Sequence, residues 1–237
     1  MIERTRRHIR RIALETPQLE ACGVIVADRR RQKVIRCRNL APDPAHRFIL
    51  SPEDFAAAGK TGNVIAVWHS HPNGPLAATV ADRSACEASG LPWHIYSVPA
   101  DNFVTIVPSG FRAPLIGREF VWGVHDCGTL VADYYREVLG IELHVEPYPD
   151  SGFWKDPCQK PYLQKFYDNG FESIATEPRI HDCLLMQLSA DEPNHAAIII
   201  DGGMILHHVQ GRLSCRDIYG GYWRQITRHI LRHRNLL

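Results

Sequence analysis

The stretch VIAVWHSHPNGPLAATVAD, residues 64–82, decides how the first part of the chain folds. Val64–Trp68 is an apolar run rich in β-branched residues, which predicts a buried strand. Residues two apart in an extended chain point to the same side, so the imidazoles of His69 and His71 can converge on one ion. Pro72 ends the strand because it has no N–H to donate to the ladder.

A helix start follows this strand. Thr79 as N-cap and Asp82 at the third helical position fit a capping pattern, which carries the carboxylate back toward the strand end. Two histidines and one carboxylate leave a fourth zinc position for water, as in catalytic sites. The alternative is that the two histidines are ordinary surface or core residues.

This pattern resembles the signature of the JAMM (MPN, Mov34) metalloprotease family, which usually has Ser where Thr79 stands. The resemblance implies Zn²⁺ held by His69, His71 and Asp82, and attack of water on an amide or isopeptide bond. It implies that Glu20, in an E-x-C-G context, is the general base. Thr79 would help to hold the oxyanion of the tetrahedral intermediate.

Composition limits the classes of function. The net charge of +1 gives no sign of bulk electrostatic capture of nucleic acid or membrane. The chain has no apolar run long enough to span a bilayer, and MIERTRRHIRR lacks the apolar core of a signal peptide, so we expect a soluble cytosolic protein. Seven cysteines at irregular spacing, without a CxxC pair, indicate buried thiols rather than disulfides.

Two domains are expected. Residues 1–108 hold the zinc pattern, and residues 109–119, with Gly110, Pro114 and Gly117, are the expected linker. Residues 120–237 form the second domain. The elements expected in the first domain are helices at 2–15 and from Ser51 and Thr79, with strands at 23–27, 33–39, 64–68, 94–98 and 103–108, a turn at 28–32 joining the first two strands.

The second domain opens with a candidate nucleophile. Asp126 is a natural N-cap for a helix that runs through Leu139 and stops at Gly140, so Cys127 lies in the first turn. The helix dipole and free N–H groups at that position favour the thiolate. His-Asp-Cys occurs again at 181–183, but there an apolar strand follows, so we interpret Cys183 as a buried thiol.

A predicted β-hairpin over residues 194–208 supplies the base. His195 and His207 stand on its two strands, and one can accept the thiol proton while the other orients it. His208 is the rival of His207, because alternation lets only one of the pair face the site. The segment 143–177, rich in Pro and aromatic residues, with a helix at 160–169, is either core under a loop or a wall of the substrate cleft.

The Asp-Cys-Gly helix start and the His-bearing hairpin resemble the NlpC/P60 cysteine peptidases. The resemblance implies that Cys127 is the nucleophile, His195 the base and His207 the third member. It also implies a papain-like α+β domain acting on peptidoglycan stem peptides, at the bond between γ-D-glutamyl and a diamino acid.

A JAMM-like α/β sandwich followed by an NlpC/P60-like domain resembles the tail-tip assembly protein K family of tailed bacteriophages, over essentially the whole chain. This resemblance implies an α+β, two-domain peptidase, whose partners are a peptidoglycan or protein substrate and other tail-tip proteins. It implies location in the host cytoplasm during assembly and in the virion tail. The alternatives are a non-catalytic assembly scaffold with relic sites and a eukaryotic-type deubiquitinase, which the extra cysteine domain disfavours.

Overall fold

The computed structural model describes residues 1–28, 31–145 and 162–237. The chain divides into two compact units, Met1–Arg112 and Ala113–Leu237, with the boundary inside the expected linker 109–119. Both ends of that range are bound to a unit: the backbone N–H groups of residues 109–111 donate to Glu87, and the buried Arg118 pairs with Asp133. Both units mix helices and strands, which confirms the predicted α+β class.

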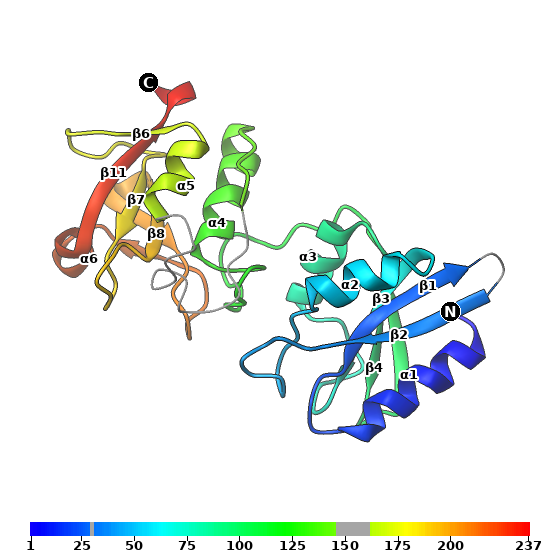
Figure 1. Ribbon diagram of the computed structural model, residues 1–237. Helices are drawn as coiled ribbons and strands as arrows, with labels where there is room; N and C mark the ends of the chain where they lie inside the picture. The colour runs from blue at the N-terminus through cyan, green and yellow to red at the C-terminus, as the bar shows by residue number, and fades with distance from the viewer. Residues whose placement is uncertain (29–30, 146–161) are drawn as a thin grey trace. The chain divides into compact units, whose positions relative to one another are not determined.

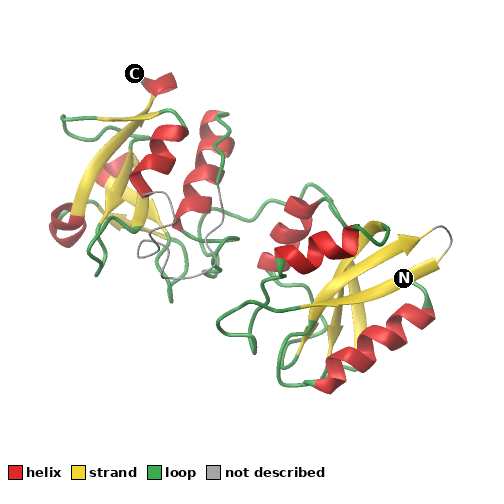
Figure 2. Cartoon of the chain, in the orientation of Figure 1, coloured by secondary structure: helices red, strands yellow, loops and turns green. Residues whose placement is uncertain are grey.

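The first unit is built on a sheet in the order β2-β1-β3-β4-β5 (Figure 1). In that sheet β3 and β4 are parallel and the other pairs are antiparallel. Helix α1 covers one face, and α2 and α3 cover the other (Figure 2). The elements are α1 (Glu3–Glu15), β1 (Cys22–Asp28), β2 (Arg31–Cys37), α2 (Pro52–Gly59), β3 (Asn63–His71), α3 (Val80–Ser89), β4 (Trp93–Ser97) and β5 (Asn102–Ile106).

Alternation along β3 explains where its histidines point. Trp68 packs in the cluster that contains Ile9 of α1, whereas Val67 packs with Cys86 of α3 on the opposite face. The strand continues beyond the predicted end at Trp68 through both histidines. His69 and His71 share the parity of Val67, so their side chains lie on the α3 face.

The second unit contains a sheet in the order β10-β9-β8-β7-β11-β6, and every described pairing in it is antiparallel. Helix α4 is continued by a π-helical turn over Tyr135–Leu139. The elements are α4 (Cys127–Tyr134), α5 (Tyr162–Asp168), β6 (Phe171–Ser173), β7 (Cys183–Met186), β8 (His195–Ile200), β9 (Met204–His207), β10 (Cys215–Ile218), α6 (Gly221–Ile226) and β11 (Thr227–His233).

Two core layers lie on opposite faces of this sheet. Ile198 of β8 packs in the cluster that contains Leu130 of α4, while its neighbour Ile199 packs in the cluster with Trp223 of α6. Each large aliphatic side chain that is buried in this way stabilises the folded state by about 1.5–3 kcal/mol. Helices α4 and α6 therefore cover different faces of the sheet, with β8 between them.

Most predicted elements are confirmed. The helix that starts at Cys127 ends at Gly140, which has a φ of +67°, a conformation that glycine adopts without steric cost. The hairpin is β8 and β9, and Cys183 is fully buried in β7. Residues 29–30 of the predicted turn and 146–161 of the aromatic segment lie outside the described residues. In the described parts of the chain, no helix has the length and apolarity needed to cross a bilayer.

Candidate functional sites

Three polar side chains of the first unit converge at the end of β3. The Nε2 atoms of His69 and His71 are 3.0 Å apart, and they lie 3.3 Å and 3.5 Å from the two carboxylate oxygens of Asp82. All three residues are buried. The capping box at the start of α3 fixes Asp82, because Thr79 Oγ1 accepts from the Asp82 N–H and Asp82 accepts from the Thr79 N–H.

This geometry fits a small divalent cation. Two ligand atoms on a tetrahedral zinc ion lie about 3.3 Å apart when each bond is about 2.0–2.1 Å long. The separations of 3.0, 3.3 and 3.5 Å bracket that value, and the two nitrogens and the carboxylate are ligands that zinc accepts. Phe48 stacks on the ring of His69 with centroids 4.6 Å apart and so restricts its orientation.

The three residues of this cluster shift one another's pKa values. Burial lowers the pKa of His69. For His71, burial opposes protonation, but the Asp82 carboxylate outweighs it and raises the pKa. Burial likewise opposes ionisation of Asp82, yet hydrogen bonds with both histidines lower its pKa well below the ordinary value. Asp82 is therefore an anion held against two imidazoles.

Glu20 and Thr79 flank this cluster. Burial raises the pKa of Glu20 to about 8, with His71 lowering it and Asp82 raising it, so the carboxyl group senses both residues. The hydroxyl oxygen of Thr79 accepts a hydrogen bond from α3, which leaves its hydrogen to donate elsewhere. The structure thus brings Glu20, His69, His71, Thr79 and Asp82 to one end of β3.

Cys127 begins α4, as predicted, but its thiol is not activated there. Burial and the neighbouring Asp126 carboxylate raise the pKa of Cys127 to about 11, so the expected stabilisation of the thiolate by the helix start is outweighed. The thiol lies 3.4 Å from the hydroxyl of Tyr162 and next to the backbone of Ala196. Among the described residues, neither His195 nor His207 is hydrogen bonded to it.

The hairpin histidines form a hydrogen-bonded chain. His195 Nε2 is 3.2 Å from His207 Nδ1, and His207 Nε2 is 3.1 Å from the Asp217 carboxylate. Nδ1 of His195, the residue before Ala196, makes no hydrogen bond to a described residue. Burial, with the charges of His207 and His208, lowers the pKa of His195 to about 3, so the ring is neutral.

His208 lies outside this chain. Its ring is fully buried and packs against Phe120 with centroids 5.0 Å apart. Neither ring nitrogen hydrogen bonds to a described residue. Burial lowers the pKa of His208 to about 4, although backbone groups of Arg118 and Arg212 act against this. Of the two rivals, His207 is the one that contacts His195.

Three further residues contact Cys127 or the two histidines, and none of them is a predicted catalytic or metal-binding residue. Asp217 is the last member of the hydrogen-bonded series that begins at His195. The ring of Trp223 packs edge-on against His207 with centroids 4.5 Å apart, and Tyr162 contacts Cys127. The tail beyond Ser214, to which no chemistry is assigned from sequence, supplies two of them. Asp217 stands two residues after Cys215 on a strand that pairs with β9, so both side chains point to the same face of the sheet. This alternation is the sequence feature from which Asp217 could have been predicted.

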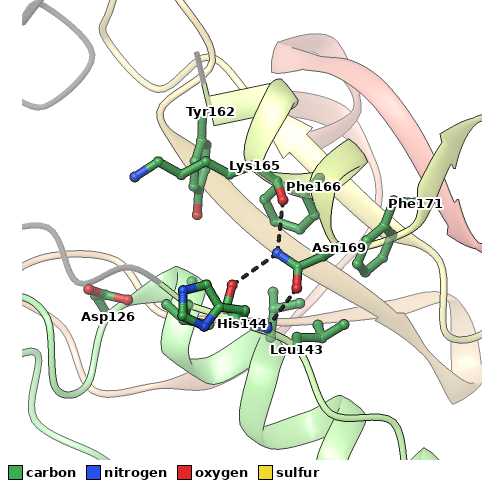
Figure 3. Close-up of a pocket in the computed structure, with 11 residues that line it drawn as sticks. Asp126, Leu143, His144, Tyr162, Lys165, Phe166, Asn169 and Phe171 are labelled. Carbon is green, nitrogen blue, oxygen red and sulfur yellow. Dashed lines mark hydrogen bonds between the residues drawn. The ribbon is translucent and has the colours of Figure 1, made fainter. Parts of the chain in front are cut away.

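A pocket lies at the start of α4 (Figure 3). Asp126 and Gly128 line it from either side of the cysteine, and Tyr162 and Phe166 line it from α5. The Asn169 amide holds the other wall, because its oxygen accepts from the His144 N–H and its nitrogen donates to the His144 carbonyl. Most lining side chains are apolar or aromatic, which is typical of a ligand pocket.

Comparison with known families defines the class of each unit. Residues 3–107 match the family described as prokaryotic homologs of the JAB domain, and residues 117–232 match the NlpC/P60 family. The chain therefore joins a JAB-like unit to an NlpC/P60 unit, as the sequence motifs predict. A crystal structure of an NlpC/P60 family protein from Bacillus cereus aligns over 96% of this chain and 67% of its own, at 12% identity and a TM-score of 0.36, too low to support an argument.

Two relatives that align over most of their own length identify the family of the whole chain. The tail tip assembly protein K of Escherichia phage N15 is 41% identical over 225 residues, which are 94% of this chain and 91% of the relative. The protein of the same name from Escherichia phage lambda is 35% identical over 188 residues, 78% of this chain and 89% of the relative. The chain belongs to the tail tip assembly protein K family.

Proposed function

We propose that the second unit is a cysteine peptidase in which Cys127 is the nucleophile and His195 the base. The observation that carries the proposal is the series of hydrogen bonds from His195 through His207 to Asp217, which begins at the residue before Ala196, whose backbone lies against the Cys127 thiol. A thiol with a pKa of about 11 needs a base to become a nucleophile.

The chain of hydrogen bonds selects the tautomer that such a base requires. Asp217 accepts a hydrogen bond from the Nε2–H of His207, so the neutral ring of His207 accepts at Nδ1 from the Nε2–H of His195. The lone pair of His195 is then on Nδ1. That atom accepts the thiol proton of Cys127, the sulfur adds to the peptide carbonyl, and the leaving amine takes the proton back. Water then hydrolyses the thioester.

The substrate proposed for this unit is a peptidoglycan stem peptide, cut between γ-D-glutamyl and a diamino acid. Support comes from the match of residues 117–232 to the NlpC/P60 family and from the pocket lined by Asp126 and Gly128, the neighbours of Cys127 in sequence, with Tyr162 and Phe166 on its wall (Figure 3).

The test is incubation of the full chain with purified muropeptides. Wild type should release products with a new amino terminus on the diamino acid, and Cys127→Ala should release none. Cys183→Ala is the matched control, since it alters the same tripeptide elsewhere and should keep the activity. Equal products from wild type and Cys127→Ala would remove the proposal.

For the first unit we propose zinc-dependent hydrolysis of an amide or isopeptide bond, with His69, His71 and Asp82 as ligands. Zinc bound there supplies a Lewis acid and lowers the pKa of a water toward about 7. The Glu20 carboxylate would accept and return the proton, and the Thr79 hydroxyl would donate a hydrogen bond to the oxyanion.

Metal analysis tests this second proposal. The purified chain should carry tightly bound zinc, and the His69→Ala, His71→Ala double variant should contain about one zinc fewer per chain while circular dichroism stays unchanged. Replacing His46, an exposed histidine of the same unit, by Ala is the control and should leave the zinc content as it was. Zinc retained at full content by the double variant would contradict the assignment.

We propose that the chain acts in assembly of a phage tail tip, with other tail-tip proteins as partners, in the host cytoplasm and then in the virion tail. The names of the two relatives support this role. A scaffold with relic sites is the rival. If Cys127→Ala particles assemble normal tails but fail to cut muropeptides, assembly and hydrolysis are separate roles of one chain.

A further inference from the structure

A second cluster of side chains that can bind a metal lies around His207, at the Asp217 end of the hydrogen-bonded series. His207 Nε2, Cys215 Sγ and an Asp217 carboxylate oxygen all lie within 4.8 Å of one another. The Nε2 atom is 3.1 Å from Asp217 and 3.7 Å from the Cys215 sulfur. Strand register produces the cluster, because Cys215 pairs with His207 across β9 and β10 and Asp217 stands two residues further on.

We propose that these three residues form a zinc site that is distinct from the His69 cluster. Imidazole nitrogen, thiolate sulfur and carboxylate oxygen are the three ligand types that zinc takes from proteins, and the fourth position is left for water. On binding, the Cys215 thiol releases its proton to solvent, and the three ligand atoms replace waters of the hydrated ion.

Arg212 controls access to this cluster. Its guanidinium group lies 3.5 Å from the Cys215 sulfur and 3.6 Å from Asp217, so it contacts two of the three proposed ligands. The Arg212 side chain is 52% exposed, so it can turn into solvent at little cost. The site is therefore selective for a cation that binds thiolate strongly enough to displace an arginine.

Zinc at this place would switch off the base, and this part of the inference rests on the proposed peptidase function. A metal on His207 Nε2 leaves the ring proton on Nδ1, which then donates to His195 Nε2. The proton of neutral His195 moves to Nδ1, the atom that must accept the proton of Cys127. The same three residues that orient the base thus hold it in the wrong tautomer when zinc is bound.

Cobalt titration of the full chain tests the site itself. Thiolate bound to Co²⁺ gives a charge-transfer absorption in the near ultraviolet, and the His69 cluster, which has no cysteine, cannot produce it. Wild type and Cys127→Ala should show the band. Cys215→Ser should lose it and bind at least about 100-fold more weakly, whereas Cys215→His should bind metal without the band. No band in wild type, or a band that persists in Cys215→Ser, overturns the site.

Imidazole nitrogen shifts measured by NMR test the switch independently of activity. Zinc should move the proton of His195 from Nε2 to Nδ1 in wild type and not in Cys215→Ser, with His195→Gln used to assign the signals. In the muropeptide assay, zinc should inhibit wild type at least about 10-fold more than Cys215→Ser, each relative to its own zinc-free rate. An unchanged His195 tautomer refutes the switch, whereas absent hydrolysis with a shifted tautomer refutes only the peptidase proposal.

Discussion

The tripeptide His-Asp-Cys occurs twice in the second unit, and the two copies have different structural roles. In the first copy Asp126 caps α4 and Cys127 lies beside Tyr162 and the backbone of Ala196. In the second copy Asp182 forms a buried bidentate ion pair with Arg232, and Cys183 is fully buried in β7.

The residues that follow each tripeptide produce this difference. After Cys127, the hydroxyl oxygen of Thr129 accepts a hydrogen bond from the Asp126 N–H and completes a capping box, so the aspartate starts a helix. After Cys183 comes Leu-Leu-Met, which is buried on both faces of the sheet and leaves Asp182 to pair with a neighbouring strand. A short motif therefore acquires its chemistry from the secondary structure that it begins.

The largest expected difference between the copies is catalytic. Cys127 is the proposed nucleophile and His195 its proposed base, so His195→Ala should lower kcat for muropeptides by about 10³- to 10⁴-fold. His181→Ala, in the second copy, should change kcat by less than about threefold. Steady-state kinetics of both variants measures the contrast, and comparable losses in the two would erase it.

The next difference is in stability. Asp182→Ala leaves the buried Arg232 without its partner and should lower the free energy of unfolding by about 3–5 kcal/mol. Urea denaturation of the full chain gives the value. Asp182→Leu combined with Arg232→Met removes both charges and should lose less than Asp182→Ala alone. A greater loss in that double variant would mean that packing, rather than charge, dominates at this position.

Asp126 should contribute less than Asp182 to the free energy of unfolding. Asp126→Ala removes the acceptor for the N–H groups of Thr129 and Gly123 and should cost about 1–2 kcal/mol. Asp126→Asn keeps an acceptor and should recover most of that loss in the same denaturation experiment. If the asparagine variant is as unstable as the alanine variant, the charge of Asp126 matters more than its hydrogen bonds.

The smallest expected effect is on the pH dependence of stability. Burial and the Arg118 charge lower the pKa of His125 to about 4, so below pH 6.5 the unfolded chain binds a proton that the folded chain does not. This residue should remove about 1 kcal/mol of stability between pH 6.5 and 5.5. His125→Gln should flatten the curve by that amount, and an unchanged slope would show that His125 does not contribute.

Local patterns were sufficient to predict the first cluster. His69 and His71 converge because β-strand alternation operates over two residues, and Asp82 is placed by a capping box that spans three. The start of α4 at Cys127 and the hairpin that carries His195 were predicted for the same reason, since the signals for helix caps and tight turns are short in sequence.

Contacts between distant elements were not predictable from these patterns. The position of Asp217 beside His207 depends on the pairing of β9 with β10, and the Asp182–Arg232 ion pair joins residues that are fifty positions apart. The raised pKa of Cys127 depends on how deeply the thiol is buried, which the helix start does not reveal. These features are set by tertiary packing, which a single sequence does not encode in a short window.

The strand order of the second unit also has a consequence for biosynthesis. Strand β11, residues 227–233, lies between β6 and β7 in the sheet and holds Arg232 against Asp182. All strands of the first unit are complete by residue 106. As the nascent polypeptide leaves the ribosome, the JAB-like unit can therefore fold before β11 is synthesised. The sheet of the NlpC/P60 unit can be completed only after that strand is available.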